Sequence, residues 1–469
     1  MINDLKRYPA MKDSGVPWLG DVPEHWRLER AKWLFHKVNR PVREDDQVVT
    51  CFRDGVVTLR KNRRVRGFTE SLKEIGYQGI RRGDLVIHAM DAFAGAVGVA
   101  HSDGKGTPVY SVCEPEPGTN AHFYAFLVRE MARSLWIASL AKGIRERSTD
   151  FRFDGFASQD VPAPPLPEQS AIVRFLDHAD RRIRRYIRAE QKLIKLLEEQ
   201  KQAIIHHAVT RGIDPNVRLK ASGVEWLGDV PEHWEVLPAK HFFREVDERS
   251  VTGTEELLSV SHITGVTPRS QKNITMFMAQ SYAGHKLCKE GDLVINTMWA
   301  WMAALGVARQ TGIVSPSYAV YRPIRRGAFH PTFIDNLLRT KPYVAEYVCR
   351  STGIRSSRLR LYPEQFLRIL LMHPSLEEQQ SILDVIANAT RKLECAIHSA
   401  QREISLLREY RTRLIADVVT GKIDVRAAAA ALPDEPDELE PIVDTDVLAE
   451  DDGAGESTDL ESVLEEVEA

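Results

Sequence analysis

The sequence lacks the short patterns that mark the commonest catalytic and metal-binding chains. Its five cysteines are scattered without a Cys-x-x-Cys pair, which argues against a zinc site and against a disulfide framework. Phosphate-loop, HExxH and GxSxG patterns are missing. The glycine-rich FAGAVG (93–98) is WMAALG in the related segment described below, so we interpret it as a strand with small residues for close packing. These absences favour a binding protein over an enzyme.

Long apolar runs are also missing. The sequence has no stretch of about 18 apolar residues, so we expect no membrane-spanning segment. Residues 1–15 lack the apolar region of a signal peptide. Together with the unpaired cysteines, this predicts a location in the reducing cytoplasm.

The chain contains an internal repeat of a whole domain. Residues 13–26 read DSGVPWLGDVPEHW and residues 221–234 read ASGVEWLGDVPEHW, so twelve of fourteen positions are identical at an offset of 208. RRGDLVIHAM (81–90) matches KEGDLVINTM (289–298) at the same offset. Repetition at so long a period indicates two domains, each with its own core, rather than a solenoid of small units.

The net charge of −3 conceals two regions of opposite sign. Residues 431–469 hold 16 acidic residues and no Lys or Arg, so the other 430 residues carry all 63 basic side chains against 50 acidic ones. A basic body favours a polyanionic partner such as nucleic acid, although many solvated surfaces are basic too. The acidic tail predicts disorder. A short apolar pattern lies at the end of the tail, at Leu460, Val463, Leu464 and Val467. We interpret it as part of a solvated tail, and a partner-binding helix is the alternative.

Each repeat shows the same order of short strands followed by helical patterns. The expected strands are 85–87, 97–99, 293–295 and 305–307, with further strands at 48–57 and 257–266. The helical patterns lie at 122–140 and 331–348 and are followed by GIRERSTDFRFDGF (143–156) and GIRSSRLRLYPEQF (353–366).

Each repeat ends in a long helix, at 165–214 and 375–424, that has no proline or glycine in its interior. Apolar residues recur along both helices at spacings near 3.5, which predicts a coiled-coil seam. The expected seam residues are Ile172, Leu176, Ile183, Leu193, Leu197 and Ile204 in the first helix and Ile382, Ile386, Leu393, Leu407 and Leu414 in the second.

These parts predict an α+β chain with a pseudo-twofold internal repeat. Two globular mixed α/β domains are joined by two long helices that form an antiparallel intramolecular coiled coil. A coiled coil between two copies of the chain is the alternative. The expected parts are domain 1 (1–163), a central helical spacer (164–214), domain 2 (215–373), a C-terminal helical spacer (374–426) and a disordered acidic tail (427–469).

The densest basic run, TLRKNRRVRGF (58–68), is expected to form a loop or hairpin. Such side chains can neutralise phosphates and place guanidinium groups on guanine edges. A solvated basic hairpin is the alternative. The candidate DNA-binding residues of this run are Arg60, Lys61, Arg63, Arg64 and Arg66.

The equivalent segment of the second repeat, GVTPRSQKNITMFM (265–278), carries different polar residues. A shared scaffold with different side chains is what two modules that read different sequences require. The candidates in this segment are Arg269, Gln271, Lys272 and Asn273. A second basic set precedes the long helices and comprises Arg145, Arg147 and Arg152, then Arg355, Arg358 and Arg360. We interpret RRIRRYIR (181–188) as the solvated face of the coiled coil.

In the order of these features the chain resembles the specificity subunit of Type I restriction–modification systems. The resemblance covers about residues 13–425 and depends on features that each occur twice. They are the WLGDVPEHW opening, the GDLVI strand, the GIR…F segment and the start of each long helix (Leu166, Glu168 and Gln169; Leu376, Glu378 and Gln379). The acidic tail departs from the family pattern, so it is given no family role.

The resemblance implies two target-recognition domains, each reading half of a split site in double-stranded DNA, and helical spacers that fix the distance between the halves. It also implies partners, namely two methyltransferase (modification) subunits and, for cleavage, restriction subunits. S-adenosylmethionine, ATP and magnesium would be bound by those partners, so we expect no cofactor and no metal in this chain.

The sequence therefore predicts a non-catalytic DNA-recognition and assembly subunit. Two other classes stay open. A DNA methyltransferase or nuclease with unrecognised motifs would transfer methyl groups or cut DNA without a partner. A coiled-coil adaptor that binds only proteins would show no sequence-selective DNA binding even with its partners present.

Overall fold

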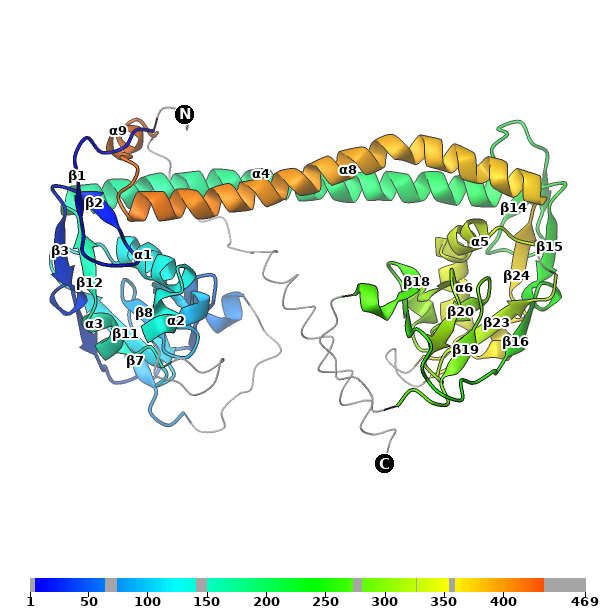
Figure 1. The fold of residues 1–469 in the computed structure, drawn as a ribbon, viewed down its shortest axis with the longest axis horizontal. Helices are drawn as coiled ribbons and strands as arrows, with labels where there is room; N and C mark the ends of the chain where they lie inside the picture. The colour runs from blue at the N-terminus through cyan, green and yellow to red at the C-terminus, as the bar shows by residue number, and fades with distance from the viewer. Residues whose placement is uncertain are drawn as a thin grey trace. The chain divides into compact units, whose positions relative to one another are not determined.

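The computed structural model describes residues 5–63, 74–140, 150–272, 281–325, 327–353 and 359–433 (Figure 1). The chain forms two compact units, Met1–Ala189 with Glu403–Ala469, and Glu190–Arg402. The long helices α4 (Leu166–Arg211) and α8 (Leu376–Val419) are continuous, and each contributes to both units. The expected fold class, with mixed helices and strands and two long helices packed together, is confirmed.

The first unit is built on a four-stranded antiparallel sheet. Its strand order is β4 (Phe35–Val38), β11 (Tyr110–Pro115), β8 (Leu85–His88) and β9 (Val97–Val99). The other strand pairs are β1 (Met11–Asp13) with β2 (Asp21–Pro23), β3 (Arg27–Arg30) with β12 (Asp160–Ala163), β5 (Val49–Cys51) with β6 (Val57–Leu59), and β7 (Gln78–Ile80) with β10 (Gly104–Gly106). The shorter helices and 3-10 turns are η1 (Ala31–Trp33), η2 (Arg60–Asn62), η3 (Ala92–Ala94), α1 (Ala121–Arg133), α2 (Trp136–Leu140), α3 (Phe153–Ala157) and α9 (Arg426–Ala430).

The second unit repeats this topology strand for strand. Its four-stranded sheet has the order β16 (Phe243–Val246), β23 (Ala319–Pro323), β20 (Leu293–Ile295) and β21 (Leu305–Val307). The other pairs are β13 (Leu219–Ala221) with β14 (Asp229–Pro231), β15 (Glu235–Pro238) with β24 (Leu370–His373), β17 (Leu258–Ser261) with β18 (Gly265–Pro268), and β19 (Lys286–Cys288) with β22 (Gly312–Val314). The shorter helices and turns are η4 (Ala239–His241), η5 (Arg269–Gln271), η6 (Ala300–Met302), α5 (Pro331–Leu338), α6 (Lys341–Arg350) and α7 (Pro363–Phe366).

The GDLVI segment forms the strand β8, which is buried on both faces. Leu85 and Ile87 belong to the core that includes α1, whereas Val86 belongs to a second core under the β5–β6 hairpin. Because successive side chains of a strand point to opposite faces, an uninterrupted apolar run is required here. In β20 the same alternation separates Leu293 and Ile295 from Val294. The strands expected at 85–87, 97–99, 293–295 and 305–307 are confirmed.

The glycine-rich run 93–98 is a packing feature of the first unit. A Cβ atom on Gly98, in β9, would lie 1.9 Å from the carbonyl oxygen of Gly55 in the β5–β6 turn. Gly95 has φ +92°, and the corresponding residue of the second unit, Ala303, has φ +61°. The small residues therefore allow the hairpin backbone to approach the sheet closely.

Four secondary-structure expectations are wrong in detail. Residues 48–57 and 257–266 are not single strands but the hairpins β5–β6 and β17–β18, because glycines at positive φ (Gly55 and Gly265) turn the chain. The helix expected at 122–140 is split into α1 and α2 at Leu135, which has φ +61°. The helix expected at 331–348 is likewise split into α5 and α6.

The repeated PEHW sequence anchors the first unit to the start of α4. The Glu168 carboxylate, in the first turn of α4, accepts hydrogen bonds from Tyr8 Oη at 2.6 Å and Trp26 Nε1 at 3.0 Å. Nε2 of His25 lies 2.8 Å from the other carboxylate oxygen. Burial and the adjacent carboxylate raise the pKa of Tyr8, which keeps its hydroxyl a donor. Three donors thus satisfy a carboxylate that is only 5% exposed.

The second unit uses the same anchor at the start of α8. Glu378 accepts from Trp234 Nε1 at 2.9 Å and lies 2.8 Å from Nε2 of His233. The next residue, Gln379, accepts from the backbone N–H of His330 at 2.7 Å and donates to Pro374 O at 2.9 Å. The opening sequence and the glutamate of the Glu-Gln pair are therefore structural partners, although about 145 residues separate them in the chain.

The two long helices run antiparallel within each unit. In the first unit Arg411 of α8 is paired with Asp180 of α4, and in the second Lys201 of α4 is paired with Glu394 of α8 at 2.9 Å. Of the expected seam residues, Ile172, Leu176, Ile183, Ile382, Ile386 and Leu414 are buried. Leu197, Ile204, Leu393 and Leu407 are half-buried.

Leu193 is wrongly placed in the seam, because it is 43% exposed. Buried residues that the heptad pattern overlooked include Ile187, Ile397, Ala400 and Ile404. Near the helix ends the buried residues of the long helices also contribute to the globular parts. Ile172 of α4 and Ile382 of α8 belong to the cores of those parts.

The expected start of the disordered tail at residue 427 is also wrong. Residues 426–430 form α9, and Val425, Ala429 and Leu432 are buried. Val425 and Ala429 join the core of the first unit, and the backbone of Asp424 pairs with that of Lys6. The alanine run is therefore helical because it has a core to pack against. Residues 434–469 lie outside the described part of the chain.

Candidate nucleic-acid interface

The two candidate basic segments occupy the same backbone frame in both units. Each follows a hairpin and begins with a 3-10 turn, η2 or η5. The backbone N–H of Arg60 donates to Val48 O at 2.8 Å, and its counterpart Arg269 donates to Leu257 O, also at 2.8 Å. The scaffold of the two segments is therefore the same, down to individual backbone hydrogen bonds.

The side chains on the first frame fall into two groups. Lys61 and Asn62 are exposed, and Arg60 is half-buried with its Nε 3.4 Å from Thr50 Oγ1. Arg63 is instead held inside the unit, where it forms a bidentate pair with Asp54 at 2.5–2.8 Å. Its guanidinium also lies 4.5 Å from the centre of the Phe52 ring. The exposed Lys61 is thus better placed for an external ligand than Arg63.

The Arg63–Asp54 pair is a structural feature of the hairpin. Burial would raise the pKa of the Asp54 carboxyl, but the hydrogen bonds and the charge of Arg63 outweigh it, so the pKa is lowered. The pair leaves the carboxylate charged at neutral pH. It also ties the β5–β6 turn, which contains Asp54, to the basic run.

The second frame carries different chemistry at the same positions. Ser270 donates to Glu256 at 2.7 Å, and Gln271 is exposed. Lys272, the counterpart of Arg63, lies 3.3 Å from Ser259 Oγ, and burial lowers its pKa. The side chains of the two frames therefore differ in charge, length and hydrogen-bonding groups.

Most other candidates fall outside the described residues. These are Arg64, Arg66, Arg145, Arg147, Asn273, Arg355 and Arg358. Arg152 is exposed and pairs with Asp150 at 2.7 Å. Arg360 is exposed, and its Nη2 lies 3.9 Å from Met298 Sδ.

The second unit also holds a half-exposed aromatic pair that the sequence analysis did not predict. The rings of Trp299 and Trp301 stack at 6.3 Å next to Met298. The corresponding position in the first unit is Asp91, which pairs with Arg53 at 3.0 Å. Exposed aromatic rings can stack on nucleic-acid bases. The repeat aligns the sequence WAW (299–301) with DAF (91–93), and this difference could have indicated the aromatic pair.

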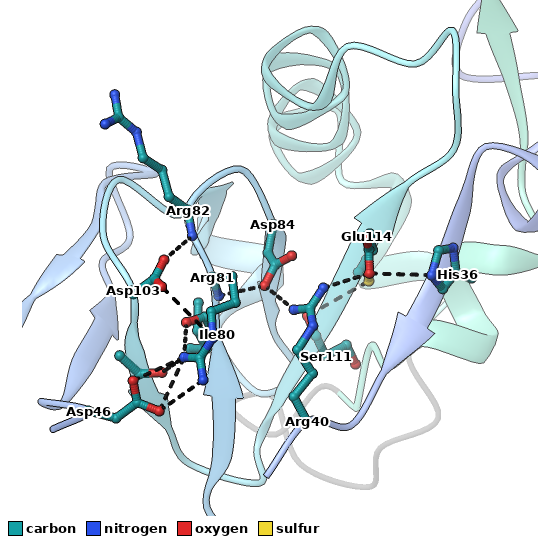
Figure 2. A network of polar contacts seen from close by, with 12 residues as sticks. His36, Arg40, Asp46, Ile80, Arg81, Arg82, Asp84, Asp103, Ser111 and Glu114 are labelled. Carbon is teal, nitrogen blue, oxygen red and sulfur yellow. Dashed lines mark hydrogen bonds and ion pairs between the residues drawn. The ribbon is translucent and has the colours of Figure 1, made fainter. Parts of the chain in front are cut away.

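A charged network in the first unit holds the turn that starts β8 (Figure 2). Arg40 bridges Asp84 and Glu114, at 2.6 Å to each carboxylate. Asp84 also accepts the backbone N–H of Arg81 at 2.7 Å, and Arg81 pairs with Asp46 at 3.0 Å. Burial raises the pKa of Asp84 in spite of these donors. Arg40 and Arg81 therefore serve the fold.

The second unit has the same network with two charges exchanged. Glu248 stands at the position of Arg40, and Arg322 stands at the position of Glu114. Arg322 bridges Asp292, at 2.9 Å, and Glu248. The hydrogen bonds from Arg322 and Lys289 lower the pKa of the exposed Glu248 to about 2. Asp292, the counterpart of the buried Asp84, thus also has an arginine partner. That arginine lies in β23, whereas Arg40 of the first unit follows β4.

Neither a metal site nor a membrane-spanning helix is found in the described residues. No group of three or more His, Cys, Asp and Glu side chains in the described ranges could hold a metal ion. No helix among them is both long and apolar enough to cross a membrane.

Comparison with known proteins adds relatives in sequence and in structure. Models of known protein families give no match to the chain. The Type I restriction enzyme MjaVIII specificity subunit of Methanocaldococcus jannaschii is 22% identical over 322 residues, which is 65% of this chain and 70% of that protein. The expected resemblance to Type I specificity subunits is confirmed. Because the relative is a specificity subunit, the comparison agrees with the expected non-catalytic role.

Comparison with solved structures shows what the fold of this chain is similar to. A chain from a study of complex assembly and conformational transition of the type I R-M system matches with a TM-score of 0.59 and 14% identity, covering 85% of this chain and 98% of that one. The HsdS subunit of Thermoanaerobacter tengcongensis matches with a TM-score of 0.43 and 14% identity, covering 86% and 98%.

Proposed function

We propose that this chain is the DNA-recognition subunit of a Type I restriction–modification complex and that its two globular parts read the two halves of a bipartite site. The observation that carries the proposal is the duplicated frame with unlike side chains. The backbone N–H groups of Arg60 and Arg269 make equivalent hydrogen bonds in the two units. The residue that follows is Lys61 in the first unit and Ser270 in the second. A common scaffold with different polar groups suits two different base sequences.

The partners follow from the same proposal. The chain would direct methyltransferase subunits to the site and would scaffold restriction subunits for cleavage. S-adenosylmethionine, ATP and magnesium would then be bound by those partners. The relatives support this assignment, since they are a specificity subunit and a chain of a type I R-M complex.

The proposal predicts that methylation requires both subunits. The full chain mixed with its methyltransferase should transfer labelled methyl groups to adenine at one bipartite sequence, whereas either protein alone should not. Sequencing of the methylated positions gives the recognised site. Methyl transfer by the single chain would point to an enzyme, and sequence-independent binding by the complex would point to a protein adaptor.

Changing Arg60 and Lys61 to alanine should relax only one half-site. Each base contact is worth roughly 1–3 kcal/mol, while loss of a phosphate contact mainly reduces the salt dependence of binding. Binding of the assembled complex to a library with randomised half-sites measures both effects. Arg269→Ala, at the same place in the second frame, is the matched control and should relax the other half-site.

Arg63→Ala distinguishes recognition from folding in the same experiment. Its removal leaves the Asp54 carboxylate without its partner, so we expect lower stability of the first unit rather than altered specificity. If Arg60 and Lys61 could be removed with no change in either affinity or half-site preference, the basic hairpin would be an ordinary solvated surface.

A further inference from the structure

One face of α4 in the first unit is strongly basic. Arg174, His178, Arg181 and Arg185 follow one another at spacings of three and four residues, so they lie along one side of the helix, with Arg182 beside them. We call these five residues the basic face. A cavity of about 290 Å³ lies against it, lined by His178, Arg181, Arg182 and Arg185 together with Ala431, Leu432 and Pro433.

The C-terminal segment is held at this face by specific contacts. Nη2 of Arg174 donates to the carbonyl oxygens of Leu432 at 2.9 Å and Pro433 at 3.2 Å. Leu432 is 8% exposed, and Ala429 of α9 is packed in the core of the first unit. The chain is therefore fixed beside the basic face where the acidic tail begins.

The residues that follow have the charge complementary to the face. Residues 434–440 read DEPDELE and contain five carboxylates in seven positions. Seven extended residues span up to about 23 Å, and the eleven-residue step from Arg174 to Arg185 covers about 17 Å of helix. The segment is thus long enough to follow the whole face.

We propose that the acidic segment 434–440 docks on the basic face of α4 in the same molecule. Because the chain is held at Leu432 and Pro433, the effective concentration of this segment at the basic face is in the millimolar range or above. A separate polyanion must therefore bind more tightly, or be more concentrated, to displace it. The docked tail occupies a surface that attracts DNA phosphates without regard to sequence. The inference stands independently of the recognition proposal, because it concerns only this chain and a general polyanion.

A photocrosslinker at Leu439 tests the contact in the full chain. Mass spectrometry should find intramolecular crosslinks to residues 174–185. Reversing two charges of the face, Arg181→Glu with Arg185→Glu, should lower the crosslink yield about tenfold, and high salt should do the same. The matched control, Lys192→Glu with Lys195→Glu, changes the same charge at exposed positions of the same helix and should leave the yield unchanged. Crosslinks elsewhere, or between molecules, would overturn the proposal.

Binding to random-sequence duplex DNA supplies the second measurement. Replacing the five carboxylates of 434–440 by their amides should raise the affinity of the full chain several-fold, to about tenfold, at low salt. In the Arg181→Glu, Arg185→Glu background the same amide replacements should have no effect. If they still raised the affinity there, the tail would act as diffuse negative charge and docking on the basic face would be wrong.

Discussion

Reversing the charge of Arg40 is expected to destabilise the first unit by about 3 kcal/mol. The Arg40 guanidinium is the bridge between Asp84 and Glu114, and the side chain of Asp84 is only 4% exposed. Arg40→Glu would leave a buried carboxylate without its cation and would add a third negative charge. Removing one partner of a buried pair typically costs 3–5 kcal/mol, and the half-exposed Glu114 places this case at the lower end.

The second unit shows how the loss can be repaired. Its network has Glu248 and Arg322 where the first unit has Arg40 and Glu114. The double variant Arg40→Glu with Glu114→Arg should therefore recover most of the stability lost in the single variant. Hydrogen exchange of the β8 amides measures the stability of this unit separately from the rest of the chain.

Arg82→Glu is the control for a general charge effect. Arg82 belongs to the same turn, but its exposed side chain points away from the network (Figure 2), so the change should stay within about 0.5 kcal/mol. A double variant no more stable than Arg40→Glu would mean that the exchanged charges of the two units are unrelated.

The internal repeat explains why so much of the fold could be predicted. Two copies of GDLVI with the same neighbours identify a strand more securely than one copy does, and β8 and β20 are both central and buried. The repeat also shows that Arg40 aligns with Glu248 and Glu114 with Arg322. The exchanged pair could have been found by comparing charges at that offset, but its spatial meaning needed the strand pairing of β11 with β4 and β8.

The candidate site was less predictable, because sequence spacing does not show how a basic side chain is used. Arg63 and Arg60 look alike in the basic run, yet Arg63 is paired with Asp54, nine residues earlier and across a hairpin. The seam of the long helices was also misplaced at Leu193, which is exposed. Because an α-helix has 3.6 residues per turn, a strict heptad pattern drifts around a straight helix by about 20° per heptad, and Leu193 lies three heptads after Ile172.

Inserting seven residues into both long helices should lengthen the spacer of the recognised site without changing its half-sites. This prediction depends on the proposed function, in which α4 and α8 determine the distance between the two half-sites. Seven residues are two helical turns and preserve the heptad, so the seam stays in register and each helix grows by about 10 Å. At 3.4 Å per base pair this corresponds to about three additional base pairs.

The antiparallel pairing fixes where the insertions belong. From the Asp180–Arg411 pair, nine residues forward along α4 reach Ala189 and nine residues backward along α8 reach Arg402, so the insertions follow Ala189 and Arg402. An insertion in only one helix should shift the seam and reduce assembly with the methyltransferase. Mapping of methylated adenines across a genome gives the half-sites and the spacer together. Unchanged spacing with altered half-sites would show that the helices do not set the distance, since only the globular parts would then have been disturbed.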